Sequence, residues 1–203
     1  MTAVRFCHWN RIIHRDLKLE NCLLDYGANV VHLGDFGSAM FEHDMVDVDG
    51  SVSSGSEAYA APESFGVDSS SPRSSMRTDI WSLGILLYGM LTGDAPWGVA
   101  HLDHDETFAY YLRHGGAFLF EQRPEISDDV RSLLLGMLAV NPEERLDINE
   151  IMSHPWVARN TVGAPFKSTP PRAPKIRLNR RKPLSIFGSG HSMHKPNCDN
   201  PLR

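Results

Sequence analysis

The chain has 203 residues, of which 41% are hydrophobic, and a formal net charge of −5. This length suits one buried core with an appended tail. The three cysteines show neither CxxC spacing nor an even count, which argues against a disulfide framework and a thiolate metal site. The densest apolar run, residues 80–91, is too short to cross a bilayer, and charged residues interrupt the N-terminal stretch, so we predict neither a membrane span nor a secretory signal.

Four elements are predicted before residue 76. In chain order they are the last turns of a helix at 2–9, an extended segment at 12–16, a β-hairpin at 22–33 and a long loop at 35–75. The hairpin is indicated by two short apolar runs that flank Asp25-Tyr26-Gly27-Ala28-Asn29, whose residue types favour a turn. The loop is rich in Gly, Ser and Asp and has too little periodicity for regular structure.

The second half of the chain is predicted to be helical. From residue 79 the apolar residues recur at spacings of three and four on several faces, which is typical of a helix in the middle of a domain. Further helices are expected at 105–113, after a cap at Ser127, and at 148–153, where Asp147 and Glu150 resemble a capping box. His154-Pro155 is expected to end the last helix.

The charge is unevenly distributed between two regions. Residues 1–156 hold 10 Lys and Arg against 24 Asp and Glu, whereas residues 157–203 hold 10 against 1. The second region also has few large apolar residues, too few to offset the entropy cost of ordering the chain. We therefore predict a domain over 1–157 and a basic, Pro-rich, disordered tail over 158–203.

Two clusters carry residue types suited to phosphoryl transfer. Within residues 14–21, Lys18 stands between Asp16 and Asn21, which offers a carboxylate for the nucleophile, a cation for the moving phosphate and an oxygen ligand for magnesium. The second cluster is Asp35-Phe36-Gly37, in which a carboxylate beside a permissive glycine could project as a hard-cation ligand.

The order and spacing of these clusters resemble the eukaryotic-type protein kinase family. His-Arg-Asp-Leu-Lys-x-x-Asn begins at residue 14, Asp-Phe-Gly at 35 and Ala-Pro-Glu at 61, followed by Asp-Ile-Trp-Ser-Leu-Gly at 79. The resemblance covers about residues 3–157. It implies a mainly α fold: the C-terminal helical lobe of a kinase, with a small β-hairpin carrying the catalytic and metal loops and the N-terminal lobe absent.

Carried over by position, the resemblance implies roles for individual residues in a reaction that uses ATP and Mg²⁺. Asp16 accepts the proton of the substrate hydroxyl, Lys18 faces the γ-phosphate, and Ser56 contacts both of them. Asn21 and Asp35 hold magnesium. Leu23 falls at the floor of the adenine pocket, although an ordinary core leucine is an equally good interpretation.

Other matches imply scaffolding. Glu63 and Arg145 match a buried ion pair, and Asp79 matches a carboxylate that braces the backbone of the catalytic loop. His14 and Phe36 match a packed spine, so we expect both to be core side chains.

The same resemblance suggests a class and a means of regulation. Lys18 and the stretch 55–63 look like the serine/threonine class, and that stretch is most similar to the calmodulin-dependent and energy-sensing branch. Arg15 is expected to sense phosphate on the activation loop. The candidate acceptors are Ser51, Ser53 and Ser54, and a plain acidic loop is the alternative. Glu20 suggests basic sequence around the target Ser or Thr.

Without a glycine-rich loop or a phosphate-gripping lysine, the chain alone is expected to transfer phosphate negligibly and to need the missing N-terminal lobe in cis. The alternative is a non-catalytic, kinase-like module that docks substrates or partners. We expect protein substrates, a monomer, a cytoplasmic or nuclear location, and no membrane or nucleic-acid partner.

Overall fold

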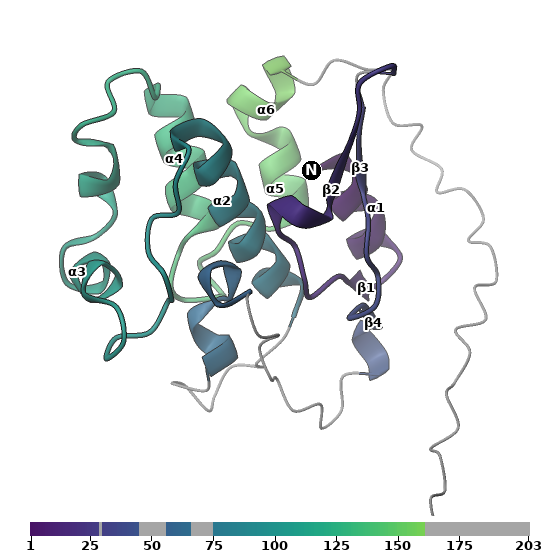
Figure 1. Cartoon of the computed structure of the whole chain (residues 1–203), viewed down its shortest axis with the longest axis horizontal. Helices are drawn as coiled ribbons and strands as arrows, with labels where there is room; N and C mark the ends of the chain where they lie inside the picture. Colours follow the sequence, from purple (N-terminus) through teal and green to yellow (C-terminus); the bar gives the residue numbers. More distant parts are fainter. Residues whose placement is uncertain (29, 45–55, 66–74, 161–203) are drawn as a thin grey trace, which may run out of the picture. The chain divides into compact units, whose positions relative to one another are not determined.

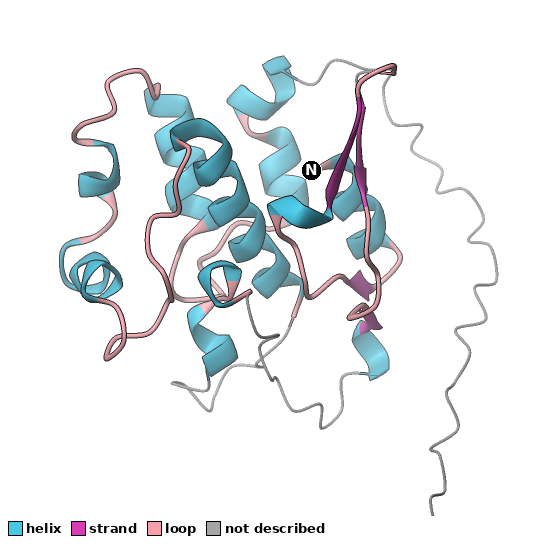
Figure 2. Cartoon of the chain, viewed as in Figure 1, coloured by secondary structure: helices cyan, strands magenta, loops and turns pink. Residues whose placement is uncertain are grey.

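A computed structural model describes residues 1–28, 30–44, 56–65 and 75–160. Helices dominate this part of the chain, and the strands gather on the side of α1, as Figures 1 and 2 show. The α-helices are α1 (Thr2–Trp9), α2 (Met76–Thr92), α3 (Glu106–His114), α4 (Asp128–Met137), α5 (Ile148–Ser153) and α6 (Pro155–Asn160). Short 3₁₀ helices lie at η1 (Leu19–Asn21), η2 (Glu42–Asp44), η3 (Glu57–Tyr59), η4 (Pro62–Phe65) and η5 (Ala117–Phe120).

Helix α2 is the centre of the hydrophobic core. It begins with a capping box between Ser75 and Thr78 and ends at Gly93, whose φ of 83° is the left-handed conformation that glycine adopts without strain. Its side chains are buried on nearly every face, and Trp81 has no exposed surface. A Cβ on Gly84 would lie 2.9 Å from the Leu138 side chain, so this glycine allows α2 to approach the end of α4 closely.

Two small antiparallel sheets lie beside α1. Strands β2 (Cys22–Asp25) and β3 (Val30–Leu33) form the predicted hairpin, with Cys22 opposite Leu33. The Asp25 carboxylate accepts hydrogen bonds from the backbone N–H of Gly27 at 2.9 Å and of Ala28 at 3.1 Å, which explains why this sequence turns here. Strands β1 (Ile12–Ile13) and β4 (Met40–Phe41) pair with each other, and so bring the start of the first sequence cluster close to the end of the second.

Most predicted elements are confirmed. The described part of the predicted loop at 35–75 has some local order, namely β4, η2, η3 and η4. The predicted helices differ from the structure at three places. Helix α2 begins at Met76, before the predicted start at residue 79. Ser127 occupies the N-cap position of α4, but its side chain makes no capping hydrogen bond. His154 does end α5, yet Pro155 begins the further helix α6, because a proline fits the first helical turn, where its missing N–H costs nothing. Among the described residues, none of the helices is long and apolar enough to cross a membrane.

Candidate active site

Asp16 is the centre of a compact polar cluster that follows strand β1. One carboxylate oxygen, Oδ1, accepts hydrogen bonds from the Ser56 hydroxyl at 2.8 Å and from the Lys18 ammonium at 3.0 Å. The other, Oδ2, lies 2.9 Å from the same ammonium group and accepts from the Asn21 amide at 3.1 Å. The structure thus brings together four of the residues that the sequence singled out.

The protonation of this cluster follows from its contacts. Burial by itself would raise the pKa of Asp16, but hydrogen bonds from Lys18, Ser56 and Asn21, with the charge of Lys18, outweigh it and lower the pKa. The hydrogen bond to Asp16 raises the pKa of Lys18, and the charges of Glu20 and Asp35 add to that effect. Asp16 is therefore a carboxylate, and Lys18 a cation, at neutral pH.

The side chain of Asn21 is oriented so that its amide oxygen remains for a ligand. Its Nδ2 donates to the backbone carbonyl of Asp16 at 2.7 Å as well as to the Asp16 carboxylate. The amide oxygen, Oδ1, is therefore the atom that Asn21 can offer to a hard cation.

The Asp35 segment joins the cluster through His14. The His14 ring lies 3.0 Å from the Gly34 carbonyl through Nε2, and it contacts the Phe36 ring edge-on at a centroid distance of 4.8 Å. The Asp35 carboxylate accepts from the N–H of Gly37 at 3.1 Å, and the residue itself is exposed. Among the described residues, no group of three His, Cys, Asp or Glu side chains could hold a metal ion.

Asp79 of α2 holds the backbone that carries Asp16. Its Oδ2 accepts from the N–H of His14 at 2.8 Å and lies 2.9 Å from His8 Nε2. Its Oδ1 accepts from the N–H of Arg15 at 2.9 Å. The bracing role implied for Asp79 is confirmed. Its partner His8 was not anticipated, because no sequence pattern signals a contact between residues 71 positions apart.

Two residues of the site have unusual backbone conformations. Arg15 has φ of 68° and Asp35 has φ of 54°, in the left-handed region that residues with a Cβ seldom adopt. The contacts with Asp79 and His14 hold the two segments in these conformations. Left-handed residues that are not glycine cluster at functional sites, where the surrounding structure determines them.

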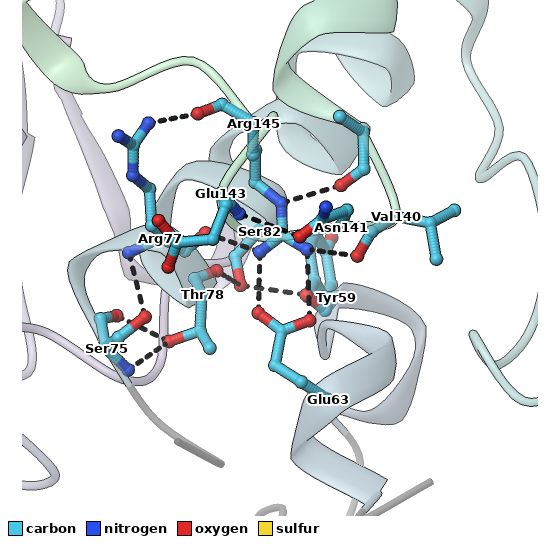
Figure 3. A network of polar contacts seen from close by, with 11 residues as sticks. Tyr59, Glu63, Ser75, Arg77, Thr78, Ser82, Val140, Asn141, Glu143 and Arg145 are labelled. Atoms are coloured by element: carbon cyan, nitrogen blue, oxygen red, sulfur yellow. Dashed lines mark hydrogen bonds and ion pairs between the residues drawn. The ribbon is translucent and has the colours of Figure 1, made fainter. Parts of the chain in front are cut away.

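A buried ion pair anchors the segment that carries Ser56. The guanidinium of Arg145 binds both carboxylate oxygens of Glu63, at 2.6 and 3.0 Å, and the two side chains are 0% and 3% exposed. Arg145 also donates to the carbonyls of Arg77, Ala139 and Val140, as Figure 3 shows for the surrounding network. Ser82 of α2 donates to the Tyr59 carbonyl at 2.8 Å. The predicted Glu63–Arg145 pair is confirmed, and its charges are fully satisfied.

The remaining predicted residues have different outcomes. Phe36, expected to be a core side chain, is 47% exposed, so that expectation is wrong: it packs on one side against His14 and leaves the other side open. Leu23, which the resemblance places at an adenine pocket, is 57% exposed on strand β2. The other interpretation, an ordinary core leucine, is therefore wrong. Arg15 contacts the Ser38 carbonyl and the Met40 sulfur. Ser51, Ser53 and Ser54 lie outside the described residues, and so does the predicted tail beyond residue 160. Residues 158–160 belong to α6, so the prediction of a disordered tail from residue 158 is wrong for these three residues.

Comparisons with known proteins identify relatives of the chain. Residues 1–157 match the family model described as the protein kinase domain. The mitosis inducer protein kinase cdr1 of Schizosaccharomyces pombe is 33% identical over 92% of this chain and 30% of that protein. The carbon catabolite-derepressing protein kinase of Secale cereale is 39% identical over 77% of the chain and 29% of that protein. The human NUAK family SNF1-like kinase 2 is 35% identical over 77% of the chain and 23% of that protein. The chain thus spans less than a third of the length of these relatives.

Proposed function

The chain belongs to the protein kinase family, and from that premise we propose that residues 1–157 are the C-terminal lobe of a serine/threonine protein kinase, which transfers the γ-phosphate of ATP to Ser or Thr of protein substrates. The observation that carries the proposal is the Asp16 carboxylate, which binds a serine hydroxyl and a lysine ammonium at the same time. The Ser56 hydroxyl donates a hydrogen bond to this carboxylate at 2.8 Å, and the hydroxyl of a substrate serine would need the same contact.

Asp16 receives the proton in the proposed reaction. The substrate oxygen forms a bond to the γ-phosphorus, the bond from that phosphorus to the β-phosphate bridging oxygen breaks, and ADP leaves with that oxygen. The hydroxyl proton passes to the Asp16 carboxylate. Because hydrogen bonds and a cation lower the pKa of Asp16, it stays ionised at neutral pH and orients the hydroxyl before it accepts the proton.

Lys18 supplies positive charge where the phosphoryl group moves. Its ammonium lies 3.1 Å from Ser56 Oγ and 2.9 Å from Asp16 Oδ2, so it adjoins the position of the attacking oxygen. Charge near the transferring group is the main contribution of protein side chains to phosphoryl transfer. The carboxylate of Asp35 and the amide oxygen of Asn21 would hold Mg²⁺, which neutralises phosphate charge when it is bound.

Exposed apolar side chains on the hairpin support the assignment to a C-terminal lobe. Leu24 and Val31 pair across the two strands and are 47% and 59% exposed, whereas Leu23, 57% exposed, pairs with His32 and lies on the opposite face. Exposed apolar side chains of this kind leave surface for a binding partner. We place the adenine ring and an N-terminal lobe against the hairpin.

The substrates are proposed to be basic near the target residue. Glu20 lies in η1, beside the cluster, and is exposed. A fixed negative charge there favours Arg or Lys in a bound peptide. A peptide array that shows equal use of neutral and basic peptides would contradict this specificity without touching the proposed reaction.

The test is phosphate transfer from radiolabelled ATP to a serine peptide. The N-terminal lobe of one of the relatives, fused before Met1, would complete the nucleotide site, and the 203-residue chain alone serves as a reference. The fusion is expected to be active. Replacing Asp16 with Asn should reduce kcat by about 10²- to 10⁴-fold, because the proton acceptor is lost.

The matched control is Asp44→Asn, an exposed carboxylate in η2 that makes no contact with Asp16. Its activity should equal that of the unchanged fusion. If Asp16→Asn is as active as this control, Asp16 is not the proton acceptor. If the fusion folds and binds ATP but transfers no phosphate, the chain is instead a non-catalytic docking module.

A further inference from the structure

Asp79 is a buried carboxylate whose hydrogen-bond partners come from two separate elements. It is 1% exposed and accepts from the backbone N–H groups of His14 and Arg15, which are successive in the chain. Its third contact is with His8 of α1, whose Nε2 lies 2.9 Å from Oδ2. Because a carboxylate oxygen only accepts, the hydrogen of this contact lies on Nε2. His8 therefore provides the side-chain donor among these three contacts.

His8 restrains the Asp79 carboxylate in a way that the two amides do not. The amides belong to one loop, which can shift together with the carboxylate when the Asp79 side chain rotates. The His8 ring is instead carried by α1, and its side chain is 3% exposed, so it is held by close packing. A donor fixed in this way restricts the rotation of Asp79, and so fixes the loop that Asp79 holds.

The neighbouring residue on α1 cannot replace His8. Burial and, to a lesser extent, the charge of Asp79 raise the pKa of Cys7 to about 11, so Cys7 is a neutral thiol at neutral pH. A thiol is a weak donor, whereas an imidazole N–H forms a full hydrogen bond with a carboxylate. Loss of the His8 ring would leave the buried charge of Asp79 with backbone donors from a single loop.

The loop that Asp79 holds carries Asp16. Asp16 directly follows Arg15, whose φ of 68° persists only while surrounding contacts maintain it. A looser Asp79 would let this backbone relax and would move the Asp16 carboxylate relative to the groups around it. Small displacements of a reacting group reduce the rate strongly, because productive geometry is narrow.

We propose that His8 is a positioning residue for phosphoryl transfer: its Nε2–H holds the Asp79 carboxylate, which holds the backbone that presents Asp16. The effect on rate rests on the proposed function, whereas the link from His8 to the loop can be measured without any activity. A residue that only stabilised the fold would leave kcat of the folded protein unchanged. A positioning residue lowers kcat and leaves KM unchanged, because Asp79 takes no part in binding ATP or peptide.

The first test is amide hydrogen exchange, followed by NMR on the 203-residue chain. His8→Leu removes the donor, and the His14 and Arg15 amides should then exchange about three- to tenfold faster. His8→Gln should restore most of the protection, because its amide nitrogen lies as many bonds from the backbone as Nε2 does. The Leu133 amide of α4, a fully buried residue, reports general loss of stability and separates it from the local effect.

The matched control is His114→Leu, which removes an exposed histidine on α3. It should leave the exchange of both loop amides unchanged. If His8→Leu does not fold, His8→Asn takes its place, since the shorter amide cannot reach Asp79. Loop amides that exchange no faster than Leu133 reports, or that behave alike in the His8 and His114 variants, overturn the proposal.

The second test measures kinetics in the fusion that completes the nucleotide site. His8→Leu should lower kcat about three- to tenfold with KM for ATP and peptide unchanged, and His8→Gln should recover most of the loss. An unaltered kcat, a raised KM alone, or no recovery with Gln overturns the positioning role. A fusion that transfers no phosphate at all contradicts the proposed function instead, and the exchange rates then decide whether His8 holds the loop.

Discussion

The chain contains two ion pairs, Glu63–Arg145 and Asp16–Lys18, that differ in how completely they are buried. The Glu63–Arg145 pair is buried, and each charged group has further hydrogen-bond partners or a bidentate contact. The Asp16–Lys18 pair is 9% and 21% exposed, and Asp16 shares its Oδ1 atom between the Lys18 ammonium and the Ser56 hydroxyl. The first pair can only hold the fold, whereas the second can exchange its partners.

This difference follows from the surroundings of each pair. Arg145 lies over the Trp81 ring, at 5.0 Å from its centroid, within the helical core. Asp16 lies in the segment between β1 and β2, and its partners Lys18, Asn21 and Ser56 come from this segment and from the one before η3. Loss of one partner should therefore cost stability in the first pair and chemistry in the second. The following predictions proceed from the largest expected effect on folding to the smallest.

Arg145→Met should destabilise the chain by about 3–5 kcal/mol, because it leaves the Glu63 carboxylate buried without a counter-charge. The free energy of unfolding, measured in urea, tests this. The control is Arg159→Met, which breaks the exposed pair with Asp129 and should cost less than about 1 kcal/mol. Equal losses for the two variants would contradict the distinction between an enclosed and an exposed pair.

Asp79→Asn should destabilise the chain by about 1–3 kcal/mol. Both carboxylate oxygens of Asp79 have partners among His14, Arg15 and His8, and the amide nitrogen that replaces one of these oxygens cannot accept a hydrogen bond. Urea unfolding measures the loss. Asp25→Asn is a suitable comparison, since the amide oxygen can still accept the two hydrogen bonds of the hairpin turn. A smaller loss for Asp79→Asn than for Asp25→Asn would show that the brace is dispensable.

Ser56→Ala should cost about 0.5–1.5 kcal/mol, the usual contribution of one hydrogen bond. It should also raise the pKa of Asp16, because burial raises that pKa and one of the hydrogen bonds that oppose it is removed. Carboxyl NMR titration reads the pKa directly. Ser132→Ala, which removes a hydroxyl on the surface of α4, should leave the titration unchanged. An unaltered Asp16 pKa in Ser56→Ala would contradict a hydrogen bond from Ser56 to Asp16.

The acid dependence of stability should change least. The folded pKa of Asp16 lies below its ordinary value of 3.8, so its ionised form stabilises the fold fully above that pH and loses this contribution as the pH falls further. The stability difference between the unchanged chain and Asp16→Asn should therefore shrink below about pH 3.8. Urea unfolding at a series of acidic pH values checks this, and a difference that grows on acidification would contradict it.

Local sequence signals predicted the local structure well. Asp25 and Gly27 identified the hairpin turn, and Asp147 with Glu150 identified the start of α5, because each feature depends on residues a few positions apart. Helix α6 was missed because Pro155 was taken as an end, although proline is equally suited to a beginning.

Tertiary features were predictable only through the resemblance to a family. The resemblance predicted that the functional residues gather around Asp16, namely Lys18, Asn21 and Ser56. It also predicted the Glu63–Arg145 pair. The exposure of Phe36 and the contact of His8 with Asp79 depend on how distant helices pack, and no spacing in the sequence encodes them.

The left-handed backbone at Arg15 and Asp35 has a consequence for the rigidity of the two segments. Each such residue costs about 1–2 kcal/mol, and contacts with Asp79 and His14 offset this cost during folding. The fold itself therefore holds both segments in one conformation, and a ligand that bound there would not have to supply the energy to reshape them. Glycine at either position would allow the segment a wider range of conformations.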